Sequence, residues 1–258
     1  MELSRFTGKN IWIIGAGDGI GLALTKALAE GGANLILSGR NQQRLKDALK
    51  IIEQPATNAL PLDVTDVQSV ADAWEKLTKK WGVIDYFIYN AGEYEPMESF
   101  RMTQVSAEKA NKIVDVNLKG FITCLGFIIP QFIEQGSGNI SVTASVFGYF
   151  GMPKSFAYGA SKAALINLAE TMRLELSQKN INVQVINPGF VKTRMTDKIS
   201  ADMPFIISPE EAAENIIKKL GKNVFEIHFP AKFSWPLKLM RLLRYEIFFP
   251  LVRMITKV

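Results

Sequence analysis

The sequence is poor in the residues that build disulfide frameworks and metal centres. Its 258 residues include one cysteine, Cys124, and one histidine, His228. A single cysteine excludes an internal disulfide and fits a reducing compartment, and we expect Cys124 to be a small buried side chain within an apolar run. One cysteine and one histidine do not supply the usual ligands of a zinc site. We therefore expect no metal and interpret His228 as a packing residue.

Long uncharged apolar segments are also missing. No such run approaches the roughly 18 residues of a membrane span. The N-terminal residues 1–10 lack the apolar core and small-residue cleavage site of a secretory signal. The composition, with 48% apolar and 21% charged residues, is that of a folded soluble domain with a substantial core. We therefore predict a cytoplasmic protein.

Excess charge is confined to the C-terminal end. Residues 229–258 carry six basic side chains and one acidic one, whereas the remainder carries 24 of each sign. The body is thus neutral overall and offers no basic patch readable from the sequence. We therefore expect no nucleic acid among the partners.

A glycine-rich segment follows the first predicted strand. Residues 10–14 include an apolar run, the segment 15–21 reads Gly-Ala-Gly-Asp-Gly-Ile-Gly, and residues 22–30 have a helical pattern. Glycines at these positions would let the backbone turn tightly beside a pyrophosphate, which the helix N-terminus would stabilise. The strand before and the helix after are the context that a dinucleotide-binding fingerprint requires.

The end of the second predicted strand bears on the choice of dinucleotide. Residues 34–38 are followed by Gly39-Arg40, nineteen residues after Gly21. A dinucleotide fold places here an acid for a free 2′-hydroxyl or an arginine for a 2′-phosphate, so Arg40 favours NADP(H). Asp18 argues the other way, because an inward-pointing anion would repel the phosphate. NAD(H) therefore stays an alternative.

Strands and helices alternate along the rest of the chain. Further strands are predicted at 59–62, 84–89, 138–143 and 182–186. Helices are predicted at 42–52, from an N-cap at Thr65 or Asp66 through Trp81, at 106–135 and around Tyr158 as far as 178. Strands that are apolar throughout indicate a parallel sheet covered on both faces. We predict one α/β domain of the Rossmann type, a doubly wound parallel sheet in three layers with ligands at the carboxyl ends of the strands.

Tyr158 and Lys162 are four residues apart, so in a helix they lie on one face, one turn apart. A nearby ammonium favours the phenolate and lowers the phenol pKa from about 10, so Tyr158 could exchange a proton with a substrate oxygen. Ser145 precedes Tyr158 by thirteen residues, and the glycines and proline between them could bring its hydroxyl beside the phenol. On spacing alone, however, such a pair is more often a surface pair.

Together these segments resemble the short-chain dehydrogenases/reductases of single-domain length, over roughly residues 8–228. Seven elements occur in the family's order: Gly15-x-x-x-Gly19-Ile-Gly21, Asp63-Val64, Asn90-Ala91-Gly92, Asn117, Ser145, Tyr158-x-x-x-Lys162, and Pro188-Gly189 with Thr193. Two departures, Ile14 where threonine is usual and Tyr89 where asparagine is usual, bear on cofactor affinity more than on chemistry.

The resemblance implies an NAD(P)-dependent oxidoreductase that interconverts a carbonyl and an alcohol by hydride transfer. It implies Tyr158 as general acid/base, Lys162 as the group that lowers its pKa and holds the nicotinamide ribose, and Ser145 as the donor that polarises the substrate oxygen. Asn117 would hold a water between Lys162 and solvent, or else is an ordinary polar residue within a helix. The cofactor-binding residues would be Gly15, Gly17, Asp18, Gly19, Ile20, Gly21, Arg40, Asp63, Val64, Asn90, Ala91, Gly92, Tyr158, Lys162, Pro188, Gly189, Val191 and Thr193.

The substrate is expected to be hydrophobic. The segment 190–207 corresponds to a mobile lid in the family, and aromatic residues lie beside Ser145 and after the fourth strand. A lipid-like, steroid-like or acyl carbonyl or alcohol fits such a pocket better than a sugar, although the same aromatics would serve equally to pack the lid on the body. The resemblance also implies a homodimer or homotetramer that forms through the helices holding Asn117 and Tyr158.

Residues 229–258 form an extension beyond the domain at 1–228. We predict a helix over Leu237–Phe248, with Lys238, Arg241 and Arg244 opposite a mostly apolar side, interrupted at Pro250. A basic amphipathic helix suits an anionic membrane surface, so residues 233–258 favour peripheral membrane association. The alternative is a tail whose apolar side packs on the body or on a partner subunit while its cations stay in water.

Two other functions compete with the reductase. The first is a non-catalytic, cofactor-binding protein that docks on membranes and senses redox state, although it would have no chemical need for Ser145, Tyr158 and Lys162. The second is a dehydratase or epimerase of nucleotide sugars, which shares Tyr-x-x-x-Lys but usually has a longer C-terminal domain.

Overall fold

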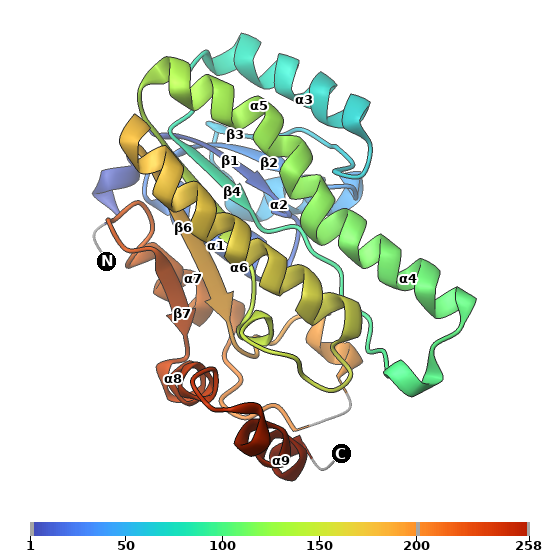
Figure 1. Cartoon of the computed structure of the whole chain (residues 1–258). Helices are drawn as coiled ribbons and strands as arrows, with labels where there is room; N and C mark the ends of the chain where they lie inside the picture. Colours follow the sequence, from blue (N-terminus) through green and yellow to red (C-terminus); the bar gives the residue numbers. More distant parts are fainter. Residues whose placement is uncertain (1–2, 200–201, 257–258) are drawn as a thin grey trace.

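The computed structural model describes residues 3–199 and 202–256, whose strands form one seven-stranded sheet. All neighbouring strands are parallel, in the order β3-β2-β1-β4-β5-β6-β7. The strands are β1 (Asn10–Ile14), β2 (Asn34–Ser38), β3 (Thr57–Ala59), β4 (Tyr86–Tyr89), β5 (Gly138–Thr143), β6 (Ile181–Pro188) and β7 (Glu226–Phe229). The order reverses direction beside β1, so the predicted doubly wound α/β fold is confirmed (Figure 1).

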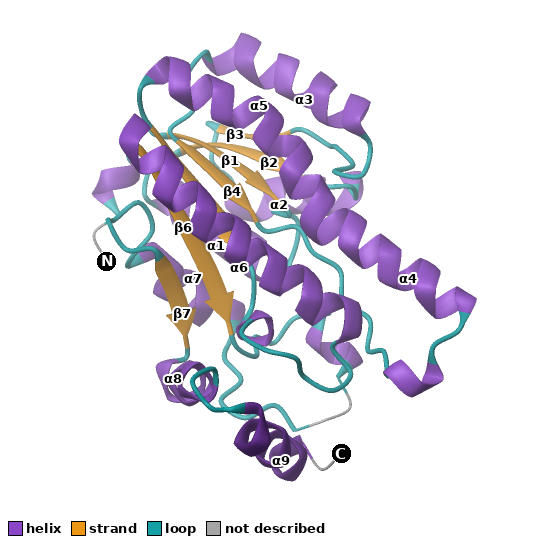
Figure 2. Ribbon diagram, in the orientation of Figure 1, coloured by secondary structure: helices purple, strands orange, loops and turns teal. Residues whose placement is uncertain are grey.

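Helices cover both faces of the sheet and complete the three layers (Figure 2). One face carries α1 (Gly19–Glu30), α2 (Gln42–Ile52) and α7 (Pro209–Ile217), and the other carries α3 (Val67–Trp81), α5 (Gly120–Gln135) and α6 (Phe156–Leu176). In β1, Ile11 and Ile13 pack on the first face while Trp12 and Ile14 pack on the second. Because both faces are buried, successive residues of the strand are apolar.

The predicted helix over 106–135 is present but contains a π-helical irregularity at Asn117. It consists of α4 (Gln104–Val114), a π-helical turn (Asp115–Lys119) and α5, and Asn117 lies in the turn. Within the described part of the chain this is the one helix long and apolar enough to cross a membrane by length and composition. In this fold it packs on the sheet, with Phe121 and Cys124 fully buried. Burial raises the pKa of the Cys124 thiol to about 12, which confirms the prediction of a buried cysteine.

The third strand begins and ends earlier than the predicted 59–62. Regular pairing stops at Ala59, and Pro61, which has no N–H, is tolerated because it lies just beyond the end of an edge strand. The chain nevertheless continues beside β2, because the amides of Leu60 and Leu62 donate to the carbonyls of Leu37 and Gly39 at 2.8 and 3.2 Å.

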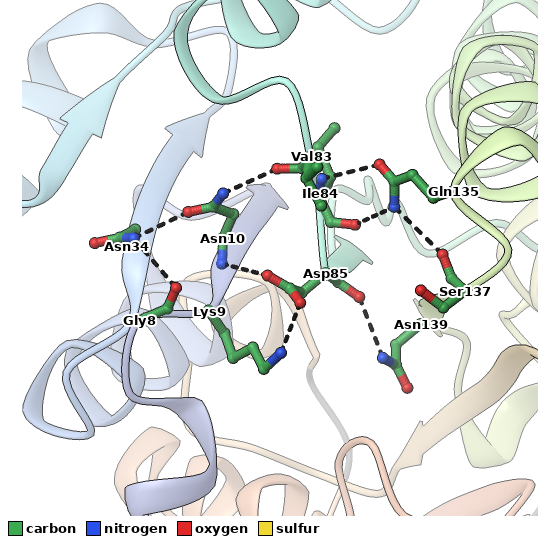
Figure 3. Close-up of polar contacts among 10 residues, drawn as sticks. All are labelled: Gly8, Lys9, Asn10, Asn34, Val83, Ile84, Asp85, Gln135, Ser137 and Asn139. Atoms are coloured by element: carbon green, nitrogen blue, oxygen red, sulfur yellow. Dashed lines mark hydrogen bonds and ion pairs between the residues drawn. The ribbon is translucent and has the colours of Figure 1, made fainter.

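A polar network ties together the amino ends of the strands, at the edge of the sheet opposite to the expected site (Figure 3). The Asp85 carboxylate accepts from Lys9 Nζ at 2.8 Å and from the Asn10 amide at 2.9 Å. The Gln135 side chain accepts from the Ile84 amide and donates to the Ile84 carbonyl, at 3.1 and 2.9 Å. These polar side chains have a structural role, because they make hydrogen bonds with backbone groups where the strands begin.

The C-terminal extension forms two helices, α8 (Ala231–Met240) and α9 (Tyr245–Thr256), so the predicted single helix over Leu237–Phe248 is wrong. After α8 the amides of Arg241 and Leu242 donate three residues back, to Lys238 and Leu239. This tighter turn ends the helix. The predicted interruption at Pro250 is also wrong, because Pro250 lies inside α9.

Tertiary packing explains why α9 tolerates a proline. Phe248 and Val252 are buried against the body, and the ring centroid of Phe248 lies 5.0 Å from that of Phe150. Burying these side chains offsets the backbone hydrogen bond that Pro250 cannot make. Part of the extension therefore packs on the body, as one of the two alternatives expected. The boundary at residue 228 stays a prediction, and residues 257–258, including Lys257, lie outside the described part.

Candidate active site

The glycine segment forms a turn that only glycines can make. Gly15 has a φ of +85°, and a Cβ there would lie 2.6 Å from the amide nitrogen of Ala91. A Cβ on Gly21 would lie 2.0 Å from the Gly15 carbonyl oxygen. The Asn90 side chain donates to that carbonyl at 3.1 Å and so fixes the turn without the hydroxyl that Ile14 lacks. This close-packed turn, with α1 starting at Gly19, fits a pyrophosphate at a helix N-terminus.

Cations and an acid surround the end of β2, where an adenosine would lie. Arg40 forms an ion pair of 2.5 Å with Glu93, which directly follows the β4 turn. Arg44, in the first turn of α2, lies beside the glycine turn, with its Cβ 3.2 Å from where a Cβ on Gly17 would be. Burial raises the pKa of Asp63, but hydrogen bonds from Thr65 and the charge of Arg40 outweigh it and hold that pKa below its usual value.

The Asp18 carboxylate is paired within the protein. Its carboxylate caps α1 by accepting from the Gly19 amide at 2.7 Å, and it forms an ion pair with Arg194. Arg194 belongs to the segment after β6. The neighbouring Thr193 lies against the glycine turn, with its Cγ2 atom 2.8 Å from where a Cβ on Gly19 would be. The charge of Asp18 is therefore matched by a cation, which weakens the repulsion that the sequence led us to expect.

Ser145, Tyr158 and Lys162 come together at the carboxyl ends of β5 and β6. Ser145 follows β5 and its Oγ accepts from the Phe147 amide at 3.1 Å, which starts a short turn. Tyr158 and Lys162 lie one turn apart on α6, and all three residues are buried. Lys162 Nζ donates to the Thr143 carbonyl at 2.7 Å and lies 5.6 Å from the Tyr158 ring centroid. The pair expected from the spacing is thus an internal one and not a surface pair.

Burial dominates the electrostatics of this group. It raises the pKa of the Tyr158 phenol to about 12, against the opposite effect of a hydrogen bond with Ser145. It lowers the pKa of the Lys162 ammonium to about 7. The net direction for Tyr158 is opposite to the predicted lowering, because Lys162 is bonded to Thr143 and desolvation of the phenolate prevails. The phenol of Tyr158 is accordingly in its neutral, protonated form near pH 7.

Asn117 holds the loop after β4 against α6. It is fully buried, its Nδ2 donates to the Glu93 carbonyl at 3.1 Å and to Ser161 Oγ at 3.0 Å, and its Oδ1 accepts from the Glu93 amide at 2.7 Å. The π-helical turn brings this side chain inward. It is therefore more than an ordinary polar residue within a helix, whereas the role of holding a water stays a prediction.

A cleft of about 480 Å³ runs along the carboxyl ends of the strands. Every predicted site residue lines it except Gly21 and Asn117, which lie behind the glycine turn and the β4 loop and support them. Arg44, Glu93, Thr143 and Arg194 also line the cleft, and the sequence analysis missed them. The one sequence feature that could have indicated these four residues is their place in the chain, because each lies next to a predicted motif or shortly after one.

The far end of the cleft is apolar. Phe147, Phe190, Tyr94 and Met195 line it near Tyr158. The rings of Tyr94 and Tyr158 meet edge to face with centroids 5.1 Å apart, and those of Phe147 and Phe190 with centroids 5.5 Å apart. Such walls exclude water and favour apolar ligand surface.

A doubly wound sheet, a glycine turn at a helix N-terminus and a buried Ser-Tyr-Lys group in one cleft define a dinucleotide-binding oxidoreductase. The comparisons specify the family: residues 9–204 match the family model for short chain dehydrogenase, so the chain belongs to the short-chain dehydrogenases. It is thus an NAD(P)-dependent oxidoreductase, from a family whose members act on small molecules and are usually oligomeric.

Individual relatives agree over most of the chain. The 3-oxoacyl-(acyl-carrier-protein) reductase FabG of Thermotoga maritima is 34% identical over 223 residues, which cover 86% of each chain. A short-chain type dehydrogenase/reductase from Mycobacterium marinum has a TM-score of 0.80 at 26% identity, covering 90% of this chain and 98% of that one. A 3-ketoacyl-(acyl-carrier-protein) reductase from Brucella melitensis, complexed with NADH, has the same fold, with a TM-score of 0.80 at 24% identity and coverage of 89% and 99%.

Proposed function

We propose that this enzyme interconverts a hydrophobic ketone or aldehyde and its alcohol, with Tyr158 as general acid/base. The observation that carries the proposal is the buried contact between Tyr158 and Ser145 at the apolar end of the cleft. A bound nicotinamide supplies or accepts the hydride. A substrate oxygen beside both hydroxyls would accept the Tyr158 proton while Ser145 stabilises its developing charge.

Lys162 and Asn117 would act through their positions. Lys162 reaches the cleft from α6 and would hold the nicotinamide ribose, and Asn117 would hold the β4 loop that lines the same end. The high pKa of Tyr158 suits the direction of reduction, because the phenol starts protonated. These roles are the ones that the family resemblance implies for Lys162 and Asn117.

Substrate class follows from the walls of the cleft. Phe147, Phe190 and Met195 favour an apolar carbonyl compound over a sugar. The Thermotoga relative is named as a reductase of 3-oxoacyl groups, and an acyl chain belongs to this class. Titration with NADPH and NADH by nicotinamide fluorescence, followed by a panel of apolar ketones, aldehydes and 3-oxoacyl compounds, tests the proposal. Binding with turnover would support it, whereas cofactor binding without turnover of any panel member would favour the redox-sensing alternative.

NADP(H) is proposed as the preferred cofactor. Arg40 and Arg44 place two guanidinium groups at the adenosine end, while Asp18 is paired with Arg194. Arg40→Ala is expected to weaken NADPH binding about 10- to 100-fold, because charge-assisted hydrogen bonds to the 2′-phosphate are lost and Glu93 is left without its partner. NADH binding should change far less. The measurement is the dissociation constant of each cofactor by fluorescence titration.

A matched control for Arg40 lies on the same side of the molecule. Lys46→Ala removes a cation from the exposed face of α2 without touching the cleft, and should leave both affinities unchanged. An equal loss of NADPH and NADH affinity in Arg40→Ala would contradict the role of Arg40 in choosing the cofactor. Tighter binding of NADH than of NADPH by the parent protein would show that Asp18, and not Arg40, determines the cofactor preference.

Assembly and location stay predictions. Exposed Ile122 on α5 and Leu174 on α6 support a homodimer or homotetramer that forms through these helices. We also keep the prediction of a cytoplasmic protein that associates peripherally with an anionic membrane through residues 233–258.

A further inference from the structure

The C-terminal helices carry an unusual concentration of exposed apolar side chains, here termed the tail surface and comprising residues 231–256. Of 20 exposed large apolar side chains among the described residues, eight lie in this short stretch. They are Trp235, Leu239, Leu242, Tyr245, Ile247, Phe249, Met254 and Ile255. Single exposed apolar residues are normal, but eight in one short stretch, with the rings of Tyr245 and Phe249 stacked 5.3 Å apart, indicate an interaction surface.

Charge indicates what covers the tail surface. Its basic residues are Lys232, Lys238, Arg241, Arg244 and Arg253, and its one acid is Glu246. Glu246 pairs with Arg244 and Glu226 of β7 pairs with Lys238, so the surface stays positive overall. A second copy of the chain would bring two surfaces of the same positive sign together, which is unfavourable. An anionic lipid surface complements both properties, because apolar side chains insert while cations meet phosphates.

The tail surface is fixed to the catalytic part of the molecule by a half-buried carboxylate. Glu226 of β7 accepts hydrogen bonds from Tyr149, from Asn187 Nδ2 at 2.7 Å and from Lys238 of α8. Tyr149 lies four residues after Ser145, on the same loop. Both helices lie at the ends of the β6 and β7 arrows in Figure 1, the edge of the sheet that holds the cleft. The tail surface is thus built onto the active site.

Two series of aromatic contacts join the body to the tail surface, and the first of them starts at the wall of the cleft. In the first, Phe190 at the wall of the cleft stacks on Phe233 of α8 with ring centroids 5.3 Å apart, and Phe233 lies 6.5 Å from the exposed Phe205. In the second, Phe150 contacts Phe248, and Phe248 contacts the exposed Phe249 with centroids 5.4 Å apart. In the first series, aromatic side chains in contact with one another lead from Phe190 at the cleft to the exposed Phe205.

The segment on which Phe205 lies is itself unusual. Phe205 has a φ of +58°, in the left-handed region, and its side chain is 54% exposed. A bulky residue adopts this conformation only where its surroundings enforce it. Phe205 thus places an exposed aromatic ring at the outer end of the series Phe190, Phe233 and Phe205.

We propose that the tail surface docks on an anionic lipid bilayer and that the carbonyl substrate is a membrane-dissolved lipid, which reaches Tyr158 along the aromatic contacts of Phe205, Phe233 and Phe190. The substrate part of this inference rests on the proposed function, whereas the docking part does not. Membrane contact would place the mouth of the cleft at the lipid surface, so that the substrate need not cross water.

The docking part is tested by cosedimentation with vesicles of phosphatidylcholine, with and without phosphatidylglycerol. The full chain should bind the anionic vesicles, and less so at high salt. Leu242→Glu/Phe249→Glu should reduce binding about tenfold or more, because two inserted side chains become anions that the lipid repels. Phe100→Glu/Val67→Glu makes the same change at two exposed sites away from the tail surface and should bind like the parent protein.

The substrate part is tested by turnover of two ketones, a short water-soluble one and a long-chain one dissolved in the anionic vesicles. Leu242→Glu/Phe249→Glu should reduce the soluble ketone as the parent does, but the vesicle-dissolved ketone about tenfold more slowly. Phe100→Glu/Val67→Glu should reduce both like the parent. A structural defect would slow both reactions together, so the difference between the ketones is the diagnostic result.

Several outcomes separate this inference from the proposed function. Absence of vesicle binding by the parent overturns docking. If the tail variant Leu242→Glu/Phe249→Glu binds vesicles normally but has a different oligomeric size in solution, the tail surface contacts a second copy of the chain. That result also overturns docking on a bilayer. Equal turnover of the vesicle-dissolved ketone by parent and tail variant overturns the route. Vesicle binding without turnover of any carbonyl refutes the proposed function and leaves docking standing.

Discussion

Tyr158→Phe is expected to lower turnover roughly 10³-fold, the range in which a positioned general acid contributes to catalysis, and to leave cofactor binding intact. The substitution removes only the hydroxyl, which is the group that meets Ser145 and faces the cleft. The ring keeps its edge-to-face contact with Tyr94, at a centroid distance of 5.1 Å, so the fold should persist. The measurements are kcat with NADPH and the ketone that the parent reduces, and cofactor affinity by nicotinamide fluorescence.

The matched control is Tyr86→Phe. Tyr86 is another buried tyrosine whose pKa is raised by burial, but it contacts Phe6 at the far side of the sheet and does not line the cleft. Removal of its hydroxyl should leave kcat and both cofactor affinities as in the parent. Retained turnover in Tyr158→Phe would assign the proton transfer to another group, and a parallel loss of cofactor affinity would give Tyr158 a binding role instead.

The fold could be predicted because its signals are local. Each strand of the parallel sheet is buried on both faces, so runs such as Ile11–Ile14 are continuous and apolar. The glycine turn could be predicted because steric exclusion at Gly15 and Gly21 admits no other residue. Ser145, Tyr158 and Lys162 lie at the ends of elements whose type the pattern indicates, and parallel strands bring those ends to one edge.

The remaining features depend on contacts that sequence periodicity does not encode. The ion pairs of Arg40 with Glu93 and of Arg194 with Asp18 join residues 53 and 176 positions apart. The pKa of Tyr158 is set by its depth of burial, which opposes the effect expected from Lys162 four residues away. In the extension, Pro250 is held inside a helix by the packing of Phe248 on Phe150. In each case a tertiary contact outweighs a local rule.

Lys162→Met is expected to lower turnover at least about 10²-fold, through loss of the group that would position the nicotinamide ribose. It is also expected to change how stability depends on pH. Lys162 is 3% exposed, and burial lowers the pKa of its ammonium to about 7 from 10.5. Between these two pH values the unfolded chain binds more protons at Lys162 than the folded chain, so raising the pH stabilises the parent protein. Below about pH 7 the cost of burying the ammonium is fully present.

In Lys162→Met no group titrates at this position, so the unfolding free energy of the variant lacks the increase with pH that Lys162 causes in the parent. The unfolding free energy of the parent minus that of the variant should therefore increase from about pH 7 to pH 10, by an amount on the order of a few kcal/mol. Urea unfolding at several pH values measures it. Lys79→Met, which removes an exposed lysine of α3, controls for the new side chain and should keep the pH profile of the parent.

The combination of the two readouts distinguishes a functional lysine from a structural one. If Lys162 served mainly to satisfy the Thr143 carbonyl, to which it donates at 2.7 Å, its removal would destabilise the protein by a similar amount at every pH. Parallel pH profiles for parent and variant would thus contradict a depressed pKa. A variant that loses turnover, yet at low pH recovers stability relative to the parent, would show that the buried charge opposes folding. That result would support the proposed role of Lys162 beside Tyr158 in the cleft.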